Sequence, residues 1–171
     1  SSIRITYYLG FAYIDIVHDK HIEELKPLSN NKAGIDLGVE NFATIVSNGE
    51  VIPSLVIKSA HLKSFNQWYN KLLANLKSEL YLTKNELKNN PNTELKTKLN
   101  TLTKRLGKLH LDRKRWMENL AHQISKAIAV YLHKTGHDKV FIGNNILDAK
   151  NSSKMSKKVN QNFIQIPFRF H

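Results

Sequence analysis

The chain has 171 residues, of which 41% are apolar, and 26 Lys and Arg oppose 14 Asp and Glu, giving a formal net charge of +12. This length and apolar content fit one domain with a core, and no apolar run reaches the length of a membrane span. The absence of Cys excludes disulfides, Cys-ligated zinc and thiol catalysis within these residues, and it fits a reducing cytoplasm. The basic excess favours nucleic acid as a partner, because Lys and Arg bind phosphates and release counterions.

Residues 1–25 predict a β-hairpin. Apolar and polar residues alternate over Ile3–Tyr8 and Phe11–Val17, on either side of Leu9 and Gly10. The polar stretch "KPLSNNK" that follows predicts a linker.

The next stretch, "KAGIDLGVENFATIVSNGE", predicts an antiparallel meander. Its first strand carries Asp36 among small and apolar residues, and its second covers 42–46. "SNGE" is a turn signal, because Asn-Gly tolerates a positive φ. Val51 and Ile52 then open a third strand.

From Ser59 the apolar spacing changes to three and four, which predicts helices over about 59–135. The polar break "NNPN" divides them, so we expect an antiparallel helical hairpin whose second helix ends near Gly136. Trp68 and Trp116 fall on or beside the apolar stripes, and we interpret both as packing residues.

The remaining residues return to the strand pattern. "KVFIGNN" predicts a short buried strand over 139–145, 146–162 predicts a basic loop, and 163–170 is apolar again. The order predicts an α/β fold with helices inserted into a sheet that is incomplete at residue 171. We expect the Asp36 strand to be central and the 139–145 strand to lie beside it.

A dense basic run lies in the second predicted helix. Asp112 is nearly its only acid, so few ion pairs can form within the helix. We expect this run to bind phosphate, although a solvated helix face is the alternative. The run consists of Lys104, Arg105, Lys108, Arg113, Lys114 and Arg115, and a second basic patch consists of Lys154, Lys157 and Lys158.

Three hypotheses fit Asp36. It could ligate Mg²⁺ in a two-metal nuclease, where carboxylates from neighbouring strands converge. It could belong to the phosphate-binding hairpin of an actin-like ATPase, although Val39, Glu40 and Asn41 follow where hydroxyl residues are usual, and the chain is short for two lobes. It could also be a structural residue at a turn.

Four strings follow one another in order: "GIDLGVENFATIVSNGE", "KSFNQWYNKLLANLKSEL", "LAHQISKAIAVYL" and "KVFIGNN…NQNFIQIPF". Together they resemble the RuvC-like nuclease core of TnpB (OrfB), the transposon-associated RNA-guided endonucleases related to type V CRISPR effectors. The resemblance runs from about residue 32 to 168. It implies a partial, RNase H-like nuclease domain over 32–171 that contains the helical hairpin, preceded by the end of a wedge β-barrel domain in 1–25.

The resemblance also implies roles for single residues. Asp36 matches the first catalytic Asp and would ligate Mg²⁺, whereas Gly143 occupies the position where the family usually has Glu. One subgroup with this form is thought to supply its Glu from further downstream. Asp148 is a second candidate metal ligand, because it follows the 139–145 strand closely. The third-motif Asp and the Cys-rich zinc ribbon of the family are absent from these residues.

The partners implied by the resemblance are a guide RNA and target DNA in the prokaryotic cytoplasm, at the nucleoid, with no membrane. With one matching carboxylate, we expect little or no cleavage by residues 1–171 alone. A nuclease-inactive, nucleic-acid-binding module or remnant is the alternative, and an actin-like ATPase fragment is a more remote one.

Overall fold

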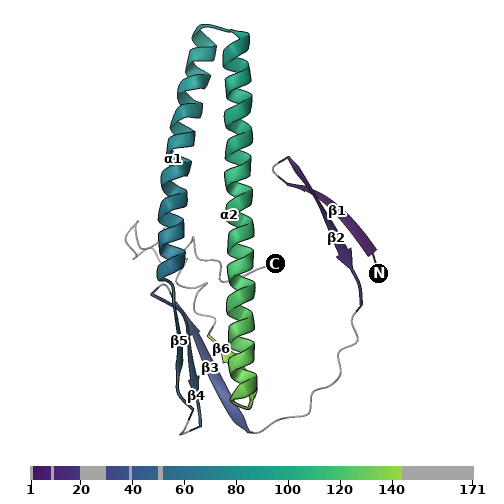
Figure 1. Cartoon of the computed structure of the whole chain (residues 1–171), viewed down its shortest axis with the longest axis vertical. Coiled ribbons are helices and arrows are strands. Elements are labelled where there is room, and N and C mark those ends of the chain that lie inside the picture. Colours follow the sequence, from purple (N-terminus) through teal and green to yellow (C-terminus); the bar gives the residue numbers. More distant parts are fainter. Residues whose placement is uncertain (1, 9, 20–29, 39, 50–51, 144–171) are drawn as a thin grey trace. The chain divides into compact units, whose positions relative to one another are not determined.

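The computed structural model describes residues 2–8, 10–19, 30–38, 40–49 and 52–143. Their elements follow the chain as two strands, three strands, two long helices and a final strand (Figure 1). The bounds are β1 Ser2–Tyr8, β2 Phe11–Val17, β3 Asn31–Leu37, β4 Asn41–Ser47, β5 Leu55–Lys58, α1 Ala60–Asn89, α2 Thr93–Lys134 and β6 His137–Ile142. The predicted α/β composition is confirmed.

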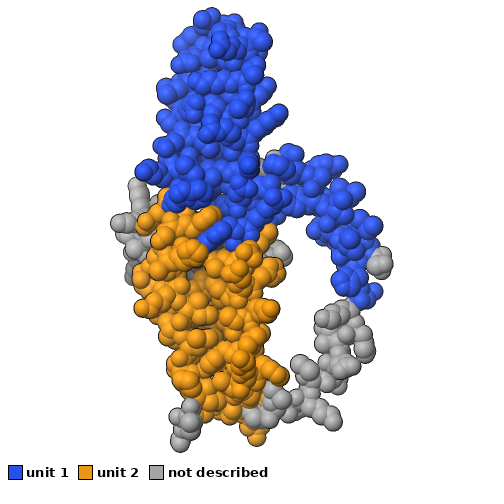
Figure 2. All heavy atoms as spheres, viewed as in Figure 1, with its two compact units in different colours: residues 1–25, 68–116 blue, residues 26–67, 117–171 orange. Residues whose placement is uncertain are grey.

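The chain divides into two compact units (Figure 2). The first comprises residues 1–25 and 68–116, and the second comprises 26–67 and 117–171. Each unit therefore holds part of both helices. Within the described residues, neither helix has an apolar stretch long enough to cross a membrane.

In the first unit, β1 and β2 form the predicted antiparallel hairpin. Ile3 lies opposite Ile16 and Ile5 opposite Ile14, and Gly10 takes the positive φ of 80° that the turn requires. Because side chains alternate along a strand, these four isoleucines share one face, and all four are exposed.

The helical part of the first unit is held together by the apolar residues that recur at spacings of three and four in both helices, which we call the apolar seam. Tyr69 and Leu80 of α1 are buried, as are Leu102 and Leu109 of α2. Trp68 is 53% exposed, so its interpretation as a packing residue is wrong. The apolar spacing places Leu62, Phe65 and Tyr69 on one side of α1, whereas Trp68 projects from the neighbouring, solvent-facing side of the turn.

The break between the helices has a clear polar cap. The Asn92 side-chain oxygen accepts hydrogen bonds from the backbone N–H groups of Glu94, at 2.6 Å, and Leu95, at 3.2 Å. Such a cap satisfies donors that the first helical turn leaves without partners. At the other end of α2, Gly136 has a φ of 69°, which confirms the predicted termination there.

The second unit contains a sheet whose described strands are ordered β5-β4-β3-β6. β3 pairs antiparallel with β4 and parallel with β6, and β4 pairs antiparallel with β5. The strand that carries Asp36 is therefore flanked on both sides, and β6 is its neighbour, as predicted.

Two details of the sheet differ from the prediction. The third strand begins at Leu55 and does not include Ile52, because Pro53, which lacks a backbone N–H, intervenes. Val51 lies outside the described residues. The final strand is not buried: Val140, Phe141 and Ile142 are all exposed. Within the described residues, β6 pairs on one side only, with β3, so its apolar side chains lie at the edge of the sheet.

The two faces of the sheet differ. Ile35 and Leu37 of β3 line a cavity of about 330 Å³ together with Ile124, Ile128 and other apolar residues of α2, so this face is turned toward the helix. Asp36 lies between Ile35 and Leu37 and opposite Thr44, and alternation places both polar residues on the other face.

A buried histidine joins three elements of the second unit. The Thr135 hydroxyl donates to the Tyr131 carbonyl at 2.7 Å, so it accepts the hydrogen bond from His137 Nδ1, also at 2.7 Å. His137 Nε2 lies 2.8 Å from the Ser47 hydroxyl, and in the neutral ring with its proton on Nδ1 it accepts from that hydroxyl. This network ties the start of β6 to the end of β4 and to the C-terminus of α2.

Candidate functional site

Asp36 lies on β3 near the carboxyl end of the strand, with its side chain exposed. Because β3 and β6 run parallel, their carboxyl ends meet at the same edge of the sheet. In open α/β sheets this edge is where ligands usually bind. The strand pairing therefore places Asp36 where a catalytic or ligand-binding carboxylate could act.

Gly143 lies beside Asp36 at this edge. It follows β6 directly, and its N–H donates to the Ile35 carbonyl at 2.9 Å. A Cβ on Gly143 would lie 3.8 Å from Asp36 Oδ1 and 3.7 Å from the Ile35 carbonyl oxygen. A side chain at position 143 would thus emerge next to the Asp36 carboxylate, and both separations are ordinary van der Waals contacts.

The described residues do not by themselves fit a magnesium site. They contain no cluster of three or more His, Asp or Glu side chains suited to hold a metal. Glu40 is the acid closest to Asp36 in sequence, and it is paired with Lys63. Asp148, the second predicted ligand, lies outside the described residues. Mg²⁺ needs near-octahedral oxygen ligands and keeps its waters tightly, so one carboxylate gives it little hold.

The residues of the basic run fall on different sides of α2. Lys108 and Arg115 follow Lys104 by four and eleven residues, so the three side chains fall within roughly 40° of arc, on the side opposite the seam. All three are exposed. We call them the α2 basic stripe.

Two further members of the predicted run flank the stripe. Arg105 is exposed, and exposed Lys114 has its Nζ 5.0 Å from the centre of the Tyr13 ring. Leu111 projects on the same side as the stripe and yet is only 2% exposed. The stripe therefore borders a covered patch, which the apolar seam alone did not predict because Leu111 is out of phase with it.

Arg113 does not belong to the exposed surface. Its guanidinium carbon lies 4.9 Å from the centre of the Tyr69 ring, and the side chain is partly buried. Burial lowers the pKa of Arg113, although a guanidinium remains charged at neutral pH. Arg113 is therefore less accessible to phosphate than the exposed members of the run, and its predicted phosphate contact stays a prediction. Arg113 is partly buried because its side chain projects on the same side of α2 as the apolar seam, where it lies between Leu109 and Trp116.

Beside Arg113 lies a polar pair that the sequence analysis missed. The Tyr69 hydroxyl is 2.6 Å from His110 Nδ1. Burial lowers the pKa of His110, and the positive charges of Lys77 and Arg113 lower it further. Neutral His110 can accept the Tyr69 hydroxyl at Nδ1, which the protonated ring could not. The sequence holds one sign of this pair, because His110 directly follows Leu109 of the apolar seam and so lies at its border.

The second predicted basic patch, Lys154, Lys157 and Lys158, lies outside the described residues, as does the predicted loop that contains it. So do the apolar residues 163–170.

The comparison with protein families identifies the class. A family model named OrfB_IS605, described as "Probable transposase", matches residues 15–147, more than three quarters of the chain. The chain belongs to this family, the TnpB family of transposon-associated proteins. Among curated proteins, none matches the chain. Membership of this family gives no support to the actin-like ATPase hypothesis.

The adjacency of Asp36 and residue 143 can be tested by restoring a carboxylate. We expect Gly143→Glu to fold, because the new Cβ meets only ordinary contacts. Two carboxylates at one edge should then bind Mn²⁺ at least tenfold more tightly than the unchanged chain, measured by calorimetry. Adding Asp36→Asn to this variant should abolish the gain. A gain that survives the second substitution would contradict the placement of the two residues.

The His110 pair predicts a pH dependence of stability. The unfolded imidazole has a pKa of about 6.5, and the folded one has a lower pKa, so the unfolded chain binds more protons as the pH falls below about 6.5. The free energy of unfolding should therefore decrease between pH 7.5 and pH 5. In His110→Gln this decrease should be smaller, as measured by urea unfolding at both pH values.

The control for this measurement is His122→Gln, which removes an exposed imidazole from the same helix. It should keep the decrease of the unchanged chain. If His110→Gln also keeps the full decrease, His110 does not contribute to it.

Proposed function

We propose that this chain is a nucleic-acid-binding part of a transposon-encoded, RNA-guided DNA endonuclease. The observation that carries the proposal is the α2 basic stripe. Its three cations lie on one exposed side of the helix, and exposed Asp112 is the one acid in the sequence from 104 to 115. Membership of a transposase family supplies the context, since such proteins act on DNA.

The partners proposed are a guide RNA and its target DNA. In such complexes base pairing reads the sequence, and the protein holds the backbones in a positively charged channel. An exposed basic helix face fits this task, because it contacts phosphates without reading bases. A DNA target would place the protein at the nucleoid.

We further propose that the second unit belongs to an RNase H-like, RuvC-type nuclease domain, with Asp36 as one metal ligand in the complete nuclease. Three observations support this proposal: the central position of β3, its parallel pairing with β6, and the place of Asp36 at the shared edge. Mg²⁺ bound there would stabilise the attacking and leaving oxygens of the phosphodiester. The hairpin β1–β2 would belong to the preceding wedge domain.

A nuclease-inactive module is the second candidate, and Gly143 favours it. In the described residues, the position beside Asp36 carries no side chain, and no cluster of metal-binding side chains compensates for it. Such a module would hold nucleic acid and leave its cleavage to other proteins.

The binding proposal predicts a specific effect of charge removal. In the variant with Lys104, Lys108 and Arg115 all changed to Gln, duplex affinity should fall almost equally for all sequences. The slope of log K against log salt should flatten by about 0.9 for each lost contact. Stability should change little, since exposed substitutions usually shift it by about half a kcal/mol. Fluorescence anisotropy at several salt concentrations measures both quantities.

The matched control changes Lys126, Lys134 and Lys139 to Gln. These three lysines are exposed, and their substitution removes the same total charge as the substitution of Lys104, Lys108 and Arg115. The control should retain most of the affinity and the slope. Equal losses in the two variants would mean that net charge, and not the α2 basic stripe, determines binding.

Asp36 separates the two candidate functions. In the complete nuclease supplied with guide RNA and matching DNA, Asp36→Asn should abolish cleavage and leave DNA binding within about twofold. If the complete protein cuts equally well with and without the substitution, Asp36 is not a catalytic ligand. If the complete protein cuts no DNA at all, the inactive module is the correct description.

A further inference from the structure

A second basic face lies on the C-terminal half of α1, within the first unit. Tyr81, Lys84 and Lys88 follow Lys77 by four, seven and eleven residues, so the four side chains fall within roughly 60° of arc. All four are exposed, and Tyr81 is 66% exposed. We call them the α1 face.

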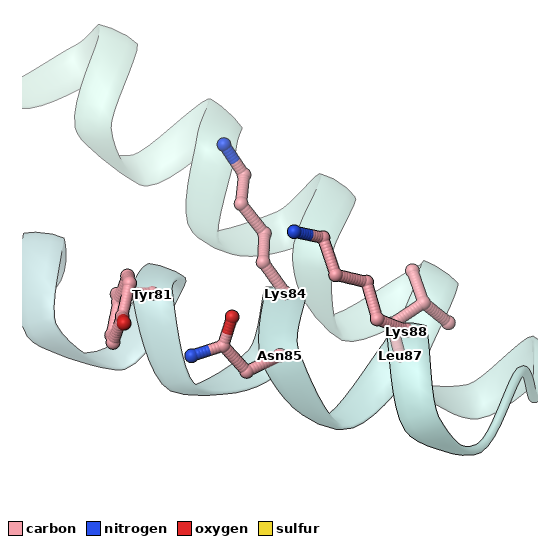
Figure 3. Close-up of a pocket in the computed structure, with 5 residues that line it drawn as sticks. All are labelled: Tyr81, Lys84, Asn85, Leu87 and Lys88. Atoms are coloured by element: carbon pink, nitrogen blue, oxygen red, sulfur yellow. The ribbon is translucent and has the colours of Figure 1, made fainter.

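The α1 face borders a shallow cavity of about 350 Å³. Figure 3 shows Lys84 and Lys88 extending from α1 in the same general direction, with Tyr81 and Asn85 beside them on the helix. The wall is formed by Tyr81, Lys84, Asn85, Leu87 and Lys88. The cavity therefore combines two ammonium groups, one amide, an aromatic ring and the apolar Leu87.

The acids of α1 do not neutralise this face. Glu79 and Glu86 are the acids in the helix, and both project from the opposite side, roughly 140° to 160° around the axis from Tyr81. Glu79 is also within 4.0 Å of Lys98 on α2. The positive charge of the α1 face is therefore available to an anion.

An exposed aromatic ring among such charges suits a particular partner. Single strands are bound by cations along the backbone together with aromatic rings on which unpaired bases stack. A duplex offers its phosphates but keeps its bases stacked on one another. The α2 basic stripe has no aromatic residue among its members, so it lacks the stacking element.

We propose that the α1 face binds single-stranded nucleic acid, with Lys84 and Lys88 on successive phosphates and the Tyr81 ring against a base. Asn85 lies beside the ring and can donate to and accept from a base edge. This inference rests on the proposed function only in assuming that the chain binds nucleic acid. It adds the class of partner and a site separate from the α2 basic stripe.

The test uses the whole chain with a labelled fifteen-nucleotide thymidine strand and a matched duplex. Tyr81→Ala should weaken single-strand binding by about fivefold to 150-fold, the range that the loss of one stacked base typically gives. Duplex affinity and the salt slope should not change, because no charge is lost. Tyr81→Phe keeps the ring and should restore single-strand affinity to within about twofold.

Two more variants complete the experiment. Leu82→Ala removes a neighbouring exposed apolar side chain that projects roughly 100° away, and it should leave binding unchanged. The double change of Lys84 and Lys88 to Gln should weaken single-strand binding and flatten its salt slope by about 0.7 for each contact. Circular dichroism confirms that each variant keeps its helices.

The outcomes distinguish this inference from the proposed function. If Tyr81→Ala binds single strands as tightly as the unchanged chain, while the triple Gln variant of the α2 basic stripe binds weakly, the α1 face is not a binding site and the proposed function stands. If the unchanged chain binds neither probe at low salt, both fail. Equal losses in Leu82→Ala and Tyr81→Ala would also overturn the inference, because they would indicate a general effect of the helix surface.

Discussion

The parallel pairing of β3 with β6 is the constraint on which the rest of the second unit depends. The two strands are separated in sequence by β4, β5 and both long helices, and a parallel pair always requires such a crossover. The entropic cost of closing a loop grows only slowly with its length. An antiparallel helical hairpin also brings the end of α2 close to the start of α1, so the long insertion does not keep β6 away from β3. The His137 network then fixes the start of β6 against β4 and α2. Without this pairing, Asp36 and Gly143 would not share an edge.

The polar groups within the helical hairpin show how the seam accommodates charge. Arg113 interrupts a series of leucines, and its guanidinium lies over the Tyr69 ring. The electrons of an aromatic face attract a cation placed over it, and this attraction partly compensates for the hydration that the cation loses on burial. The Tyr69 hydroxyl in turn has His110 as a partner, so the pair satisfies both polar groups. Burial, together with the positive charges of Lys77 and Arg113, lowers the pKa of His110 and so favours the neutral imidazole, which can accept this hydrogen bond.

Periodicity in the sequence predicted the elements well, because each depends on local spacing: the Ile3–Ile16 hairpin, the helices on either side of "NNPN", and the turn at Gly136. The central position of Asp36 followed from the order of the strands. Exposure was harder to predict, because it depends on neighbours distant in sequence. Phe141 is exposed on β6, which pairs on one side only among the described residues. Leu111 is buried out of phase with the seam, and Arg113 is turned toward Tyr69. The sequence could not show a complete metal site, since such a site needs several converging carboxylates and the described residues contain no group of three or more His, Asp or Glu side chains that could hold a metal.

The length of the α2 basic stripe sets the size of the footprint that it can make. Lys104 and Arg115 are eleven residues apart, which corresponds to about 16 Å along a straight helix. B-form DNA advances about 34 Å in one turn, so the stripe runs beside roughly half a turn, or about five base pairs. A contact of this extent follows the phosphates on one side of a duplex and cannot encircle it. A longer heteroduplex would therefore need further cationic surfaces, each contacting a different stretch of the same backbone.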